Sequence, residues 1–159
     1  MQFREGERVL KVFHHHPTPF IFWFFEIFLA FLICFIPLYL LQDIIPFSFF
    51  IIINIAFFVF FAFIIFYKSI IYWLDKLIIT NQRIVHVNWL NLFKRKESEA
   101  LLNDIQDIKT SEKGLISYFS FFDYGSFALE TASAKTTILF EQAPDPEGIR
   151  QYIYHVRSI

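Results

Sequence analysis

Two polar side chains lie inside long apolar stretches and are the first candidates for chemistry. Glu26 is the single charge in the run Phe20–Leu41, and Asn54 lies within the uncharged run Phe47–Tyr67. A carboxylate inside a bilayer is costly and often serves ion or proton transfer, whereas an asparagine there commonly joins helices through hydrogen bonds. Glu26 lies about 9 Å from the end of its run at the helical rise, so it can instead reach the membrane surface or pair with Lys68.

The histidine triplet His14-His15-His16 is a second candidate, because imidazole is a common metal ligand. Consecutive residues cannot all face one ion in a regular helix or strand, and no thiol or carboxylate cluster lies beside them. Cys34, the single cysteine, lies in an apolar run where burial leaves a thiol unreactive. We therefore predict neither a metal site nor a cofactor.

The basic triplet Lys94-Arg95-Lys96 is a candidate contact for anionic lipid headgroups. Each Lys or Arg close to such a surface contributes about 1 kcal/mol. Glu97 and Glu99 follow at once, and this half of the chain is neutral overall. A solvated strand is therefore the alternative interpretation of the triplet.

Motifs of the common enzyme classes are missing from the sequence. It has no P-loop, dinucleotide-binding fingerprint, nucleophile elbow or HExxH motif, and no Ser, His and acidic residues are spaced as a triad. A net charge of −1 provides no field that would attract nucleic acid. We expect a non-enzymatic protein with no catalytic residues, no nucleic-acid partner and no small-molecule substrate.

The elements that carry these residues follow from hydropathy. The 159 residues are 56% hydrophobic and include 24 Phe, whereas only 18% are charged. A helix of about 20 apolar residues crosses a bilayer core of about 30 Å. The two runs therefore predict transmembrane helices over residues 20–41 and 47–71, the second with a cytoplasmic extension, joined by a short external loop at 42–46.

Basic residues indicate the orientation of this helical hairpin. The loop at 42–46 contains no Lys or Arg, whereas Arg4, Arg8, Lys11 and Lys68 flank the other ends of the helices. The positive-inside rule then places both termini in the cytoplasm, with residues 1–19 as a cytoplasmic segment. We expect a multi-pass protein whose first partner is the lipid bilayer.

Residues 72–159 change to short, strand-rich patterns and predict a cytoplasmic domain. Alternation and turn residues predict strands at Trp73–Thr80, Arg83–Trp89, Phe93–Leu101, Ile105–Thr110, Ser126–Thr131 and Thr136–Phe140. Asp145-Pro146-Glu147 is typical of a helix start. The residues Ile149, Tyr152, Ile153 and Val156 then form one apolar stripe at helical spacing.

Several short motifs in this order resemble one known family. The first motif is Leu77-Ile78-Ile79-Thr80-Asn81-Gln82-Arg83-Ile84, which contains Thr80, Asn81 and Arg83. The second is Asp123–Thr131, which contains Tyr124 and Gly125. The third lies near the start of the sequence and reads Gly6-Glu7-Arg8-Val9. These segments, together with Asn103–Ile108 and the junction Ala143–Pro146, resemble the bacterial pleckstrin-homology-like membrane proteins of the YdbS/YdbT type. One departure is Asp123, where the family often has Gly.

The resemblance implies a membrane α + β protein. A two-helix transmembrane hairpin would precede a PH-like antiparallel β-sandwich or partly open barrel, capped by a C-terminal α-helix. It also implies a bacterial cytoplasmic membrane. From the residues themselves, Thr80 and Asn81 suit a turn, and Gly125 suits a bulge or a close backbone approach.

The favoured function is a non-enzymatic module that presents the PH-like domain at the cytoplasmic membrane face for protein interaction or self-assembly. Its partner would be a second copy or another membrane protein. An anionic-lipid-binding sensor using Lys94–Lys96 is the first alternative, and a small transporter or channel component using Glu26 is the second.

Overall fold

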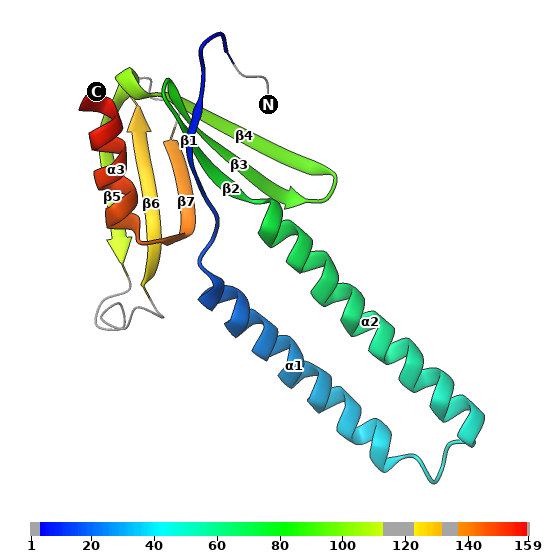
Figure 1. Ribbon diagram of the computed structural model, residues 1–159. Coiled ribbons are helices and arrows are strands. Elements are labelled where there is room, and N and C mark those ends of the chain that lie inside the picture. The colour runs from blue at the N-terminus through cyan, green and yellow to red at the C-terminus, as the bar shows by residue number, and fades with distance from the viewer. Residues whose placement is uncertain (1–3, 113–122, 132–136, 159) are drawn as a thin grey trace. The chain divides into compact units, whose positions relative to one another are not determined.

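The computed structural model describes residues 4–112, 123–131 and 137–158. Its elements run in the order β1 (Val9–Phe13), α1 (Pro17–Leu40), α2 (Phe47–Leu74), β2 (Lys76–Thr80), β3 (Arg83–Asn91), β4 (Lys94–Leu101), a short 3₁₀ helix (Leu102–Asp104), β5 (Ile105–Glu112), β6 (Tyr124–Thr131), β7 (Thr137–Pro144) and α3 (Pro146–Ser158) (Figure 1). The chain divides into a helical unit, Pro19–Ile70, and a β-rich unit, Met1–Thr18 with Ile71–Ile159.

The helical unit consists of α1 and α2, which are apolar on all sides. Phe31 on α1 contacts Phe57 and Phe61 on α2, with ring centroids 5.3 and 5.4 Å apart. Both helices are long and apolar enough to cross a membrane, judged by length and composition alone.

The prediction that a strand starts at Trp73 was wrong. The Asp75 amide donates to the Ile71 carbonyl at 3.1 Å, so the helix continues through Leu74.

The β-rich unit contains two antiparallel sheets, one in the order β1-β2-β3-β4 and the other in the order β5-β6-β7. Among the described residues the strands form these two sheets and no closed barrel, as expected for a PH-like arrangement. The strand beginning predicted at Thr136 lies outside the described residues, and β7 is described from Thr137.

Strand β1 is not indicated by the sequence pattern, because its five residues precede the first helix and include a lysine. It pairs with β2, so that Phe13 lies opposite Leu77. Both helices are therefore inserted between two neighbouring strands of one sheet. The chain enters α1 from β1 and returns from α2 into β2.

The main core lies between the two sheets and α3. Phe127, Phe140 and Ile79 are fully buried there, and Ile149 and Ile153 add the predicted apolar stripe of α3. Asp145 is the predicted N-cap, since its side chain accepts a hydrogen bond from the Gly148 amide at 2.8 Å. The other face of β3 buries Val85 and Val87 in a smaller cluster, so both faces of this strand are covered.

Gly125 permits a close approach of two strands, as its sequence position suggested. A Cβ atom there would lie 2.0 Å from the backbone oxygen of Ser111 on β5. The register of β6 with β7 also shifts between Gly125 and Phe127. A side chain at this position would separate the strands, so the glycine has a structural role.

Candidate functional site

Arg83 at the start of β3 is almost completely buried and binds two carboxylates. Its Nε and one terminal nitrogen donate to the two oxygens of Glu7 at 2.9 and 3.0 Å, a bidentate geometry. Its other terminal nitrogen donates to Glu99 on β4. The Glu7 side chain is shielded from solvent. The arginine therefore joins the N-terminal segment to the middle of the four-stranded sheet.

Thr80 and Asn81 complete this connection. The Thr80 hydroxyl accepts a hydrogen bond from the Arg83 amide at 2.9 Å and donates to its carbonyl at 2.8 Å, which closes the predicted turn. The Asn81 side chain accepts from the Arg8 amide at 2.8 Å and donates to the Gly6 carbonyl at 3.1 Å. The motif residues Thr80, Asn81 and Arg83 thus form one structural cluster.

The electrostatics of this cluster favour the charged forms of its members. Hydrogen bonds from Arg83 lower the pKa of Glu7 from 4.5 to about 2. The hydrogen bonds that Arg83 donates to Glu7 also raise the pKa of Arg83, and its contact with Glu99 raises this pKa further. A second cation, Arg4, lies 3.7 Å from Glu99, so each carboxylate of the cluster has a basic partner within the protein.

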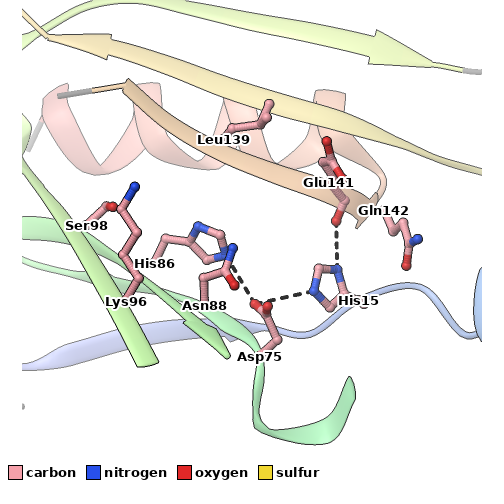
Figure 2. A pocket seen from close by; sticks show the side chains of 9 residues that line it. All are labelled: His15, Asp75, His86, Asn88, Lys96, Ser98, Leu139, Glu141 and Gln142. Atoms are coloured by element: carbon pink, nitrogen blue, oxygen red, sulfur yellow. Dashed lines mark hydrogen bonds and ion pairs between the residues drawn. The ribbon is translucent and has the colours of Figure 1, made fainter. Parts of the chain in front are cut away.

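A second polar cluster surrounds Asp75, the residue between α2 and β2. His86 of β3 lies with its Nε2 3.1 Å from Asp75 Oδ1, and His15 lies with its Nε2 3.3 Å from the same oxygen (Figure 2). We call Asp75, His15 and His86 the Asp75 cluster. It joins the segment before α1, the end of α2 and the centre of the sheet.

Contacts with β7 orient the two imidazoles. The His15 Nδ1 lies 2.7 Å from the Glu141 carbonyl. The His15 ring stacks on Phe140 at 4.7 Å, and the His86 ring meets the same phenyl edge-on at 5.3 Å. A carbonyl and an ionised carboxylate both only accept hydrogen bonds. Both ring nitrogens of His15 therefore face hydrogen-bond acceptors, which fixes the orientation of the ring.

The pKa of Asp75 reflects two opposing effects. Burial alone would raise it, but the hydrogen bonds and charges of His15 and His86 outweigh burial and lower the pKa from 3.8 to about 2. Asp75 is consequently an ionised carboxylate buried between two histidines.

A polar pocket of about 420 Å³ opens beside the Asp75 cluster. It lies over β3, β4 and β7 (Figure 2). Its other lining residues are Asn88, Lys96, Ser98, Leu139, Glu141 and Gln142. The described residues include no group of three or more His, Cys, Asp or Glu side chains that could hold a metal ion.

The three consecutive histidines face different partners. The His14 ring lies 6.4 Å from Trp73, His15 belongs to the Asp75 cluster, and the His16 ring stacks on Tyr124 at 5.6 Å. Burial lowers the pKa of His16, although the charge of Asp123 opposes this shift. The triplet packs the segment before α1 against other parts of the β-rich unit.

The other candidate residues lie apart from these clusters. Glu26 is exposed on α1, and the Asn54 side chain donates to the Phe50 carbonyl of its own helix at 2.8 Å. Lys94 and Arg95 are exposed at the beginning of β4, whereas Lys96 lines the pocket. The roles predicted for these residues in the membrane or at lipid headgroups stay predictions.

Sequence reasoning missed Glu7, Asp75 and His86 as site residues. One signal was present for His86, which shares the predicted strand face of the core residue Ile84 and is therefore a buried polar side chain. Asp75 was the first acidic residue after the second apolar run. Glu7 lies in the motif Gly6-Glu7-Arg8-Val9, but nothing local indicates its pairing with Arg83, which is 76 positions away in the sequence.

One protein family matches most of the sequence. The chain belongs to the bacterial PH domain family, whose profile matches residues 21–157. It is also similar to the crystal structure of a DUF1696 family protein with a pleckstrin-homology domain from Shewanella loihica, with 16% identity and a TM-score of 0.40. That likeness covers 52% of this chain and 70% of the other. No curated protein matches the sequence. The finer likeness to the YdbS/YdbT type stays a prediction.

Replacing Arg83 by Met is expected to lower the free energy of unfolding by about 3 kcal/mol, because the shielded Glu7 carboxylate loses its counter-charge. The double variant that also carries Glu7→Gln should recover part of the lost free energy of unfolding. Denaturant unfolding of the full chain in detergent micelles measures both. The control, Arg150→Met, breaks an exposed pair with Glu147 and should cost less than about 1 kcal/mol. Equal losses for the two arginine variants would contradict the buried role of Arg83.

Asp75→Asn is expected to lower stability by about 1 to 2 kcal/mol at neutral pH. A carboxyl whose pKa is depressed in the folded state stabilises it above the unfolded pKa, near 3.8, and loses this contribution as pH falls towards about 2. The difference between wild type and variant should therefore disappear across that range. Unfolding midpoints of the full chain at several pH values measure it, with Asp104→Asn on the surface as the control. A difference that persists at the lowest pH would show that the charge is not responsible.

Proposed function

We propose that this protein is a membrane-tethered, non-enzymatic PH-like module of the bacterial cytoplasmic membrane. Its two helices insert as a hairpin with both chain termini in the cytoplasm. The β-rich unit is presented at the cytoplasmic face, where it assembles with a second copy or with another membrane protein.

The composition of α1 and α2 is the observation that carries this proposal. The helices are 24 and 28 residues long and have no polar face, and their side chains are largely exposed. A helix in water would normally hide one apolar stripe and present a polar one. A bilayer is the solvent that accommodates apolar side chains on all sides of a helix pair.

The connections between helices and sheet support the tether. β1 continues into α1, and α2 continues into β2 through Asp75 alone. The β-rich unit is therefore attached by two chain segments that are paired with each other. A tethered module gains an effective local concentration for partners in the same membrane.

The edges of the sheets support interaction with a protein. β1 pairs with one neighbour, β2, and its residues Val9, Leu10 and Val12 are 39 to 44% exposed. An edge strand with exposed apolar side chains can add a strand from a partner. The polar clusters support a non-enzymatic role, since the Arg83 and Asp75 side chains are engaged by internal partners.

Topology mapping tests the tether. In a Cys34→Ser background, a cysteine at Asp43 should react with a membrane-impermeant maleimide in intact spheroplasts. A cysteine at Gln151, exposed on α3, should react only after the membrane is permeabilised. Labelling of position 151 in intact spheroplasts, or release of the chain by alkaline carbonate, would contradict the proposal.

Crosslinking in native membranes tests assembly. We expect covalent dimers or a defined complex with another membrane protein, and we expect Leu10→Glu on β1 to reduce them at least several-fold. Tyr154→Glu, a substitution of an exposed apolar residue on α3, is the matched control and should leave the products unchanged. Monomers at every crosslinker concentration would exclude stable assembly.

A further inference from the structure

The hairpin of β3 and β4 extends beyond the rest of its sheet. β2 begins at Lys76, which pairs with Val87, so the part of β3 after Val87 pairs with β4 alone. This two-stranded extension ends at Leu90–Arg95, which we call the hairpin tip (Figure 1). By strand rise it projects about 13 Å past the start of β2.

The hairpin tip carries apolar side chains that the described residues leave wholly or about half exposed. Phe93 is 98% exposed and Leu90 is 54% exposed. The turn itself is held by Asn91, whose side chain accepts a hydrogen bond from the Phe93 amide at 3.0 Å. Turn tips usually carry short polar residues, so the exposed phenyl ring together with Leu90 makes this tip a candidate for contact with an apolar surface.

Cations and an interfacial aromatic residue flank this apolar tip. Lys94 and Arg95 are exposed, and the Arg95 guanidinium lies 5.6 Å from the centre of the Trp89 ring. Apolar side chains beside Lys, Arg and Trp are typical of protein segments that lie in the interface of an anionic bilayer. Lys96 does not belong to this surface, since it lines the pocket beside His86.

The place of the tip in the sheet favours a bilayer over a protein partner. The tip extends from the end of the sheet at which the chain leaves α2, and Asp75 alone separates Leu74 from Lys76. Trp73, in the last turn of α2, is 76% exposed. A helix that spans a membrane ends at its interface, so the residues that follow it directly, and the strand paired with them, lie within reach of the headgroups.

We propose that the hairpin tip inserts into the interface of an anionic bilayer. Leu90 and Phe93 lie against the upper acyl chains, and Lys94 and Arg95 bind headgroup phosphates. This inference rests on the proposed membrane tether and adds a second, reversible membrane contact to it. The contact would hold the β-rich unit in one orientation on an anionic surface and release it on a neutral one.

Fluorescence quenching on the full chain tests the inference. A single cysteine at Leu92, in the Cys34→Ser background, carries an environment-sensitive fluorophore and leaves Leu90 and Phe93 in place. The chain is reconstituted in nanodiscs of phosphatidylglycerol or phosphatidylcholine that contain a lipid with a spin label in its acyl chain. The control label is at Leu101, an apolar position at the other end of β4.

In phosphatidylglycerol, we expect the lipid spin label to quench the fluorophore at position 92 at least several-fold more than the fluorophore at position 101. In phosphatidylcholine, this difference in quenching should be much smaller. Lys94→Gln with Arg95→Gln should lower the inserted-to-free ratio about thirtyfold, since each cation contributes about fivefold. Phe93→Ser should also reduce quenching. Lys109→Gln with Arg150→Gln, which removes two exposed cations elsewhere, is the matched control and should leave the ratio unchanged.

Three outcomes separate the hypotheses. If the chain remains with the lipid after flotation and alkaline washing but position 92 is quenched no more than position 101, the tip inference is wrong and the tether stands. If the chain does not remain with the lipid, the tether itself is wrong. A third result would be that the fluorophore at position 92 is shielded from water only when a nanodisc holds two copies of the chain, and that the lipid label does not quench it. The tip would then contact a second copy, and the inference would be wrong.

Discussion

The buried guanidinium of Arg83 holds the segment that leads into β1 beside β2 and β3, which follow about 60 residues later in the chain. Arg83 binds Glu7 with two hydrogen bonds and Glu99 with a third contact, and Asn81 binds the backbone on either side of Glu7. Closing a flexible loop of about 60 residues would cost about 4 kcal/mol. The ion pairs and the β1–β2 ladder offset this cost, and the helices reduce it because ordered segments have less freedom to lose.

The Asp75 cluster performs a related task at the point where the two ends of the helical insertion meet the sheet. Asp75 follows α2, His15 precedes α1, and His86 lies at the centre of the sheet. Burying a lone carboxylate would be costly, and the two imidazoles compensate it. A buried polar cluster with directional bonds also specifies one arrangement of the three segments, which apolar contacts alone do less well. Three of the residues that line the pocket beside it, His15, Asp75 and His86, already have these structural partners.

The distribution of apolar surface is consistent with two different environments for one chain. The β-rich unit buries Phe127, Phe140 and Ile79 in a core between its sheets. The helical unit exposes most of its phenyl and isoleucyl side chains. The hairpin tip is the place where the β-rich unit also exposes a complete phenyl ring beside cations. The proposed bilayer accounts for both exposures, because its core would surround the helices with hydrocarbon and its interface would offer acyl chains and phosphates to the tip.

Hydropathy and periodicity in the sequence were sufficient for the two apolar helices, most of the strands, the N-cap of α3 and its apolar stripe, because these depend on neighbours within a few residues. The turn at Thr80 was also local, and the glycine at position 125 indicated a bulge or a close approach although the neighbouring backbone, at Ser111, belongs to another strand. The sequence could not indicate β1, since a five-residue strand acquires its conformation from the partner strand across the helical insertion. It could not indicate that Glu7 contacts Arg83 or that Asp75 lies between two histidines, because these contacts join residues up to about 76 positions apart. Only the tertiary structure decided them, since burial and pairing of charges depend on which distant segments the fold brings together.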